Sequence, residues 1–285
     1  MRTGRLVFLL AAAITASVSC SQSPPAADIV GAANERIERD HLEAVVKLAV
    51  AVTNPADRLA VTGSRLDESM DGYEFRPISV FFPTSSGVFS SARVPYAVRL
   101  DKSGHVQEIN QMPENRLSLA MGEFGNERNG DGSDRVLKSV GSGVRTTVLI
   151  KLRQPVQERD LNLFVSSESS APVLLSGVRR TGNPIYWSGE EGCFKSATQR
   201  DCASYSSLAQ FKSWVAQLRP NDDTTLNGFG LSVAELRQAA TAGLIYGTIV
   251  DGGSPAAIRK LRKHPNVSGM WITDMRPCPR GDECP

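Results

Sequence analysis

The cysteines are the residues whose number and spacing first suggest chemistry. The chain of 285 residues contains five of them: Cys20 stands alone near the start, and the others are Cys193, Cys202, Cys278 and Cys284. In an oxidising compartment four thiols can form two disulfides, with three possible connectivities. Two short loops are the simplest arrangement, so we expect Cys193 to pair with Cys202 and Cys278 to pair with Cys284.

The histidines limit the catalytic chemistry that the chain could perform. His41 lies among acidic residues, His105 follows a turn and His264 ends an expected helix, and none belongs to an H-E-x-x-H zinc motif. The cysteines form no C-x-x-C pair for zinc, and the sequence has no G-x-S-x-G nucleophile elbow. We therefore predict no metal, no cofactor and no catalytic residue, and a protein that acts by binding. An enzyme with a scattered active site is the alternative.

The start of the chain has the pattern of an export signal. Arg2 and Arg5 precede an apolar run over residues 6–16, which is broken only by Thr15 and ends in small residues. This run is far shorter than the roughly 20 residues that span a bilayer as a helix. The pattern predicts a signal peptide at residues 1–19, with a buried N-terminal helix as the alternative.

The border at Cys20 carries a resemblance to a known class of protein. The stretch "SVSC" followed by "SQSPPAAD" resembles the N-terminus of bacterial lipoproteins, in which the cysteine is diacylated and becomes the first residue. Ser19 matches the small residue expected there, whereas Ser17 replaces the usual aliphatic residue. The resemblance implies a membrane anchor at Cys20, a polar tether over residues 20–32 and a place in the bacterial cell envelope. An ordinary cleavage that leaves Cys20 unpaired or removes it is the alternative.

Cysteine parity and charge both bear on this interpretation. Five cysteines leave one without a disulfide partner, which needs an explanation in an exported chain. Lipidation of Cys20 would supply it. The chain has 32 basic and 30 acidic residues, and Arg2 and Arg5 leave with the signal, so the mature chain has 30 of each. A nucleic-acid-binding protein normally has a basic excess. We therefore expect the lipid membrane as a partner, an envelope protein as a further candidate, and no nucleic acid.

Hydrophobic patterns predict an α+β fold with a β-rich N-terminal region at residues 33–135. Residues 33–52 are predicted as a helix, although their apolar end also fits the period of a strand. The stretches "GYEFRPISVFF" and "PYAVRL" are typical of strands. Gly104 ends the turn "DKSG", which should join two strands in a hairpin.

The remainder, residues 144–285, is predicted as an α/β C-terminal domain. We expect a strand at residues 144–152, a hairpin at residues 172–189 and a helix at residues 207–218. A further helix should begin with a capping box of Ser232 and Glu235 and end at Gly243. The predicted sheet is mixed and is packed by helices.

The end of the chain is predicted as a β-α-β unit. Two parallel, neighbouring strands at residues 244–250 and 267–275 should be linked by a helix capped by Ser254, with Ile258 and Leu261 facing the sheet. Four basic residues of this helix should be solvated, and contact with an anion or a lipid headgroup is the alternative. They are Arg259, Lys260, Arg262 and Lys263.

A second resemblance covers about half of the chain. The stretch "TTVLIKLRQPVQERDLNLF" and residues 242–274, "AGLIYGTIVDGGSPAAIRKLRKHPNVSGMWITD", are similar to the two ends of the extracytoplasmic C-terminal domain of bacterial sigma-factor regulators. This sequence departs from that family, because we expect neither a cytosolic sigma-binding segment nor a membrane span in it. The resemblance therefore implies an architecture and a binding or sensing module for another envelope component, without catalytic residues. A purely structural lipoprotein is a further alternative.

The anchor is open to a direct test. Replacing Cys20 by Ser removes the acyl acceptor, so the protein should move from the membrane fraction to the soluble fraction of lysed cells. The matched control, Ser21→Ala, should stay with the membrane. Membrane retention of Cys20→Ser equal to that of the control would show that Cys20 is not the anchor.

Overall fold

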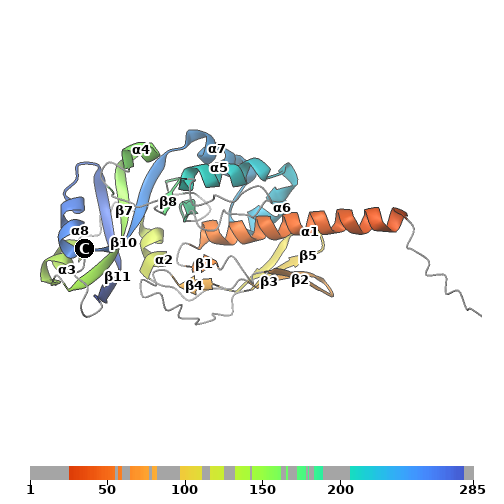
Figure 1. Ribbon diagram of the computed structural model, residues 1–285, viewed down its shortest axis with the longest axis horizontal. Coiled ribbons are helices and arrows are strands. Elements are labelled where there is room, and N and C mark those ends of the chain that lie inside the picture. Colours follow the sequence, from red (N-terminus) through yellow and green to blue (C-terminus); the bar gives the residue numbers. More distant parts are fainter. Residues whose placement is uncertain are drawn as a thin grey trace, which may run out of the picture. The chain divides into compact units, whose positions relative to one another are not determined.

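The structure is a computed structural model of the chain (Figure 1). It describes residues 26–54, 57–59, 65–76, 79–81, 97–110, 116–124, 132–141, 143–161, 165, 172–177, 179, 183–188 and 206–278. By its contacts the chain divides into two units after Glu38, and the second unit, Arg39–Pro285, holds all the strands. Helices occur together with antiparallel sheets, which confirms the predicted α+β class.

Helix α1 (Ala26–Thr53) changes character along its length. Residues 34–40 are exposed on every side, whereas every residue from Val45 to Val52 is buried. Apart from Lys47 these residues are apolar. A helix that is apolar nearly all round belongs inside a protein, which explains why this run matched the period of a strand as well as that of a helix. The helix ends where the side chain of Asn54 donates to the backbone oxygen of Val50, at 3.0 Å.

The N-terminal strands form one sheet of four strands and one two-stranded pair. The four-stranded sheet has the order β2-β3-β5-β6, and β1 pairs with β4; all these pairings are antiparallel. Their bounds are β1 Asp57–Leu59, β2 Arg65–Ser69, β3 Gly72–Arg76, β4 Ser79–Phe81, β5 Val98–Asp101 and β6 Val106–Ile109. Two helices follow, α2 (Arg116–Glu123) and α3 (Gly132–Ser139).

The predicted hairpin at Gly104 is confirmed. Gly104 has φ +81° in the turn between β5 and β6, and its backbone oxygen accepts from the hydroxyl of Thr225 at 2.7 Å. Burial raises the pKa of Asp101. The hydrogen bonds from the backbone N–H groups of His105 and Ser103, together with the charge of His105, lower it by more, so the pKa is below its ordinary value. The carboxylate therefore stays ionised and holds the turn.

The C-terminal strands form a five-stranded antiparallel sheet with the order β11-β7-β10-β8-β9. Their bounds are β7 Val144–Val156, β8 Val173–Leu174, β9 Tyr186–Trp187, β10 Ile245–Gly253 and β11 Val267–Pro277. The predicted hairpin at residues 172–189 is confirmed by the pairing of β8 with β9.

The prediction that the last two strands are neighbours is wrong. β10 and β11 run parallel to each other, but each pairs antiparallel with β7, which lies between them. Residues 146–150 of β7 are all buried, as a central strand covered on both faces requires. The connecting helix α8 packs on β7 and β11. Its diameter of about 10 Å matches two strand spacings of about 4.8 Å, so the crossover reaches over one strand.

Both faces of this sheet carry apolar side chains, because consecutive residues of a strand point to opposite sides. Leu149 of β7 lies beside Ile249 and Trp271, and these three belong to one cluster. The next residue, Ile150, lies beside Met270 and belongs to the larger cluster that also contains the buried half of α1. The larger cluster includes residues from both of the predicted domains.

The predicted serine caps of α7 and α8 are confirmed, and α5 has a serine cap that was not predicted. α5 begins after Ser206, α7 after Ser232 and α8 after Ser254, and each serine side chain accepts from the backbone N–H three residues on. Gly243 ends α7 with φ +59°, as predicted. The bounds are α4 Glu158–Leu161, α5 Ser207–Gln217, α6 Asp223–Leu226, α7 Val233–Ala242 and α8 Pro255–Arg262, with short 3₁₀ helices η2 Pro220–Asp222 and η3 Asn227–Phe229.

The buried half of α1 should dominate the stability of the fold. Leu48→Ala leaves a cavity in the core and should lower the free energy of unfolding by about 3 kcal/mol. Ile37→Ala on the same helix is the control, because Ile37 is 57% exposed, and it should change stability by less than about 0.5 kcal/mol. Urea denaturation measures both. Equal, small effects would contradict the central place of α1.

Candidate functional site

A hollow with a volume of about 370 Å³ opens between α2, α3 and β11. Both helices contact β11, which is the outermost strand of the five-stranded sheet (Figure 1). One wall is formed by Arg116, Leu119, Ala120 and Glu123 of α2. These residues follow the i, i+3, i+4, i+7 spacing of one helix face.

Helix α2 is held by the face that it turns to the sheet. Leu117, Met121 and Phe124 are at most 4% exposed and pack in the same cluster as Trp271. Leu119, in contrast, is 52% exposed at the hollow, so an apolar side chain here contacts solvent. An exposed aliphatic side chain beside an apolar hollow is typical of a binding site.

The floor of the hollow is formed by Trp271, Ile272 and Met275 of β11. The indole Nε1 of Trp271 donates to Oε2 of Glu123 at 3.0 Å, which fixes the ring and gives its buried N–H a partner. The ring of Phe124 lies beside it, with 6.0 Å between the ring centroids. The aromatic floor is therefore held rigidly from two sides.

The second wall, on α3, is attached to the edge of the sheet. Gly132, Ser133 and Val136 line the hollow, and the buried hydroxyl of Ser133 donates to the backbone oxygen of Met270 at 2.9 Å. This bond satisfies a carbonyl group of the edge strand. It also sets the distance between α3 and β11, and thus the width of the hollow.

The four basic residues of α8 divide into two pairs. Nη1 of Arg259 donates to the backbone oxygen of Leu137 at 2.7 Å, and Nε of Arg262 lies 3.6 Å from a carboxylate oxygen of Asp134. Both arginines therefore attach α8 to α3, a role that the sequence did not indicate. Lys260 and Lys263 are exposed, as predicted for a solvated face. Contact of this cluster with an anion or headgroup stays a prediction.

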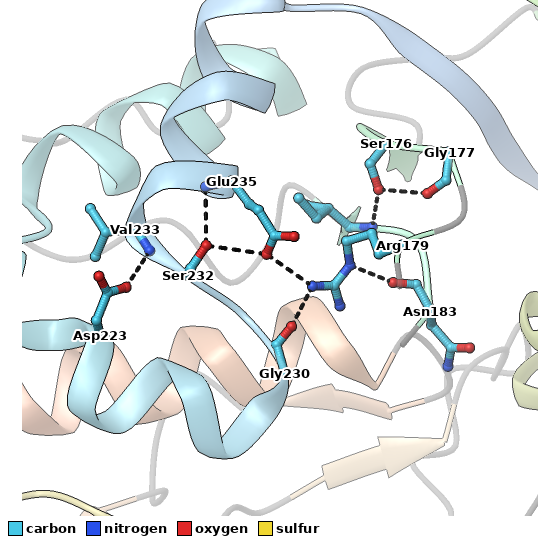
Figure 2. Close-up of polar contacts among 10 residues, drawn as sticks. Ser176, Gly177, Arg179, Asn183, Asp223, Gly230, Ser232, Val233 and Glu235 are labelled. Atoms are coloured by element: carbon cyan, nitrogen blue, oxygen red, sulfur yellow. Dashed lines mark hydrogen bonds and ion pairs between the residues drawn. The ribbon is translucent and has the colours of Figure 1, made fainter. Parts of the chain in front are cut away.

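A buried arginine organises the segment before α7 (Figure 2). The side chain of Arg179 is 7% exposed; its Nη1 donates to the backbone oxygen of Gly230 at 2.6 Å and its Nε to that of Asn183 at 2.8 Å. Oε2 of Glu235 lies 3.7 Å from Nη1 and accepts from the hydroxyl of Ser232. Burial lowers the pKa of Arg179 and the Glu235 carboxylate raises it, with a net lowering. This network joins parts of the fold, and none of its residues lines the hollow between α2, α3 and β11.

The predicted capping box is confirmed in its first half. The Ser232 side chain accepts from the backbone N–H of Glu235 at 3.2 Å. The Glu235 carboxylate contacts the Ser232 hydroxyl and the Arg179 guanidinium. The side chain expected to close the cap therefore also anchors a residue more than fifty positions earlier in the chain.

None of the histidines lines the hollow. His41 contacts both carboxylate oxygens of Asp222, at 3.0 and 3.1 Å, and links α1 to η2. His105 contacts Asp101 across its own turn at 3.2 Å. Nδ1 of His264 accepts from the backbone N–H of Asn266 at the end of α8. The His41 contact therefore joins distant parts of the sequence, and the other two contacts are local.

The predicted cysteine chemistry falls mostly outside the described residues. Cys20, Cys193, Cys202 and Cys284 all lie there, and Cys278 is disulfide-bonded. Lipidation of Cys20 and the two disulfide pairs therefore stay predictions. Within the described ranges, no group of three or more His, Cys, Asp or Glu side chains could hold a metal ion.

Comparison with known proteins adds no relative. No family model matches the chain, and neither a curated protein nor a solved structure is significantly similar to it. No helix in the part of the chain that the structure describes is long and apolar enough to cross a membrane. The hollow is therefore the feature that bears most directly on function.

Sequence reasoning missed the walls of this hollow, because α2 and α3 were not predicted. The signal for α2 is present: Leu117, Ala120, Met121 and Phe124 have the spacing of an apolar helix face. For α3 the signal is weak, because its buried residues are only Ser133 and Leu137. Its position depends on contacts with β11 and α8, which lie more than a hundred residues away in the sequence.

The Arg179 network makes a testable prediction about stability. Arg179→Met removes the donors for two backbone oxygens and should lower the free energy of unfolding by about 2–3 kcal/mol. Glu235→Gln should cost less than about 1 kcal/mol, because the Glu235 side chain is 42% exposed and water screens its charge. Chemical denaturation of both variants provides the comparison. A larger loss for Glu235→Gln would mean that the ion pair, and not the backbone contacts, holds the segment.

Proposed function

We propose that the chain is a lipid-anchored protein of the bacterial cell envelope that binds another envelope component in the hollow between α2, α3 and β11. The hollow is the observation that carries the proposal. It combines an aromatic floor with an exposed Leu119, which lies between two charged residues on the α2 wall, on a rigid support. Such a surface suits an apolar group of a partner, since burying it removes apolar area from water.

The location in the proposal comes from the start of the sequence. The basic residues, the short apolar run and Cys20 support export and lipidation, and the polar segment after Cys20 supports a tether. A lipid anchor keeps the folded unit close to envelope components. The equal numbers of basic and acidic residues in the mature chain favour recognition by shape and apolar contact over attraction by net charge.

Two glycines allow a sharp test. Gly132 lines the hollow and Gly122 lies on the exposed side of α2, and a Cβ at either position would meet no atom within 4 Å. Gly132→Trp should therefore fill the hollow without straining the fold. Gly122→Trp adds the same side chain outside the hollow and is the matched control.

The measurement is photo-cross-linking in the cells that make the protein. A photoreactive amino acid at position 119 should form an adduct, whereas one at Met70, which is 94% exposed on another element, should not. Gly132→Trp should abolish the adduct and Gly122→Trp should preserve it. Adducts of equal yield at both positions, or an adduct that persists in Gly132→Trp, would contradict binding in the hollow.

A further inference from the structure

The hollow runs along the edge of a sheet, and the direction of the backbone groups at this edge can be derived. In an antiparallel pair, alternate residues point their N–H and C=O groups at the partner strand, and the others point them away. Two hydrogen bonds show which residues of β11 point their backbone groups away from β7. The oxygen of Met270 accepts from Ser133, which lies outside the sheet, whereas the N–H of Cys278 donates inward to Gly143 at 2.9 Å.

Counting along the strand places the outward groups within the hollow. The pairing of β11 with β7 contains a bulge: Ile272 and Asp274 pair with consecutive residues of β7, so Thr273 is an extra residue on β11. With this residue included, both contacts give the same outward positions: Ile272, Met275 and Pro277. A proline suits such a position because its nitrogen has no hydrogen to donate. Ile272 and Met275 both line the hollow. Among the described residues, no strand pairs with this side of β11.

The charges on the α2 wall define the length of a ligand. Arg116 and Glu123 line the hollow seven residues apart, which is about 10.5 Å along a helix with a rise of 1.5 Å per residue. An extended peptide covers about 3.3 Å per residue, so about three residues span this distance. A peptide with an ammonium group near Glu123 and a carboxylate near Arg116 complements both charges. Leu119 lies between the two charged residues on the helix, and Trp271 donates to Glu123 from the floor of the hollow.

We infer that the ligand is a short peptide of about three residues with free ends, which adds to the edge of β11 as an extended strand. Its backbone would pair with the outward groups of Ile272 and Met275, and an aliphatic side chain would contact Leu119 and Trp271. The inference rests on the proposed function, and it specifies the class of ligand for the same hollow. Strand addition supplies affinity through backbone hydrogen bonds and specificity through the side-chain pocket.

Three probes separate these contributions on the full chain purified in detergent. Ala-Leu-Ala with free ends should bind with saturation, as observed by calorimetry and by the NMR signal of the Trp271 indole N–H. Blocking either end should weaken binding about two- to fivefold, since each end forms a solvent-exposed ion pair. Successive N–H groups of an extended strand point in opposite directions, so one of the two peptide N–H groups, that of the leucine or that of the last alanine, faces β11. N-methylation of that residue should weaken binding about tenfold, and N-methylation of the other should change it little.

Matched variants assign each end of the peptide. Glu123→Gln keeps an oxygen that accepts from Trp271 but removes the charge, so it should weaken the free-ended peptide and leave the N-acetylated one unchanged. Arg116→Ala should do the same for the free and C-amidated peptides. The control is Arg135→Ala, an exposed arginine on α3 that does not line the hollow, and it should change nothing.

The outcomes separate this inference from the proposed function. Failure of the free-ended peptide to bind, or binding of both N-methylated peptides as tight as that of the unmethylated one, would overturn strand addition. If the cross-link at position 119 were still blocked by Gly132→Trp in that case, the hollow would keep its proposed function with another ligand class. Equal binding of free-ended and blocked peptides would overturn the role of the two charges, and with it the assignment of a short peptide.

Discussion

The apolar half of α1 is the constraint on which the rest of the fold depends. From Val45 to Val52 the helix is buried on every side, so other elements must surround it. The four-stranded sheet contributes Leu66 and Phe75 to the same cluster, and the five-stranded sheet contributes Val148 and Ile150, among others. A single helix thus joins strands from the beginning and from the end of the sequence. Residues 39–285 consequently form one unit rather than two independently packed regions.

The position of β7 follows from the same need for burial and decides where a site can form. β7 has the longest run of consecutive buried residues in the sheet and lies between β10 and β11, which leaves β11 as the outermost strand. An edge strand has backbone groups that need partners. Ser133 of α3 supplies one of them at Met270, and the hollow lies beside the positions that follow. The candidate site is therefore a consequence of strand order, which places an edge between two helices.

Sequence patterns predicted local structure well wherever one residue type has a strong local effect. The turn at Gly104, the end of α7 at Gly243 and the serine cap of α8 are confirmed for this reason. Strand order was not predictable in the same way, because adjacency in a sheet is set by packing of segments more than ninety residues apart. The hollow was missed for a related reason: Trp271 and Glu123 are 148 positions apart, and neither residue alone differs from an ordinary core or surface residue. The roles of Arg179, Arg259 and Arg262 likewise depend on backbone oxygens or side chains that only the fold brings near.

Binding in the hollow is tested most directly by amide hydrogen exchange of the membrane-bound chain, compared before and after removal of other envelope components. In the intact envelope, exchange should be slower over α2 and over the end of β11, at residues 116–124 and 270–277. Exchange should not change over the exposed residues 34–40 of α1 or over the β2–β3 turn around Met70. Unchanged exchange at α2 and β11, with slower exchange at α1 or at Met70, would contradict the assignment of the hollow as the binding site.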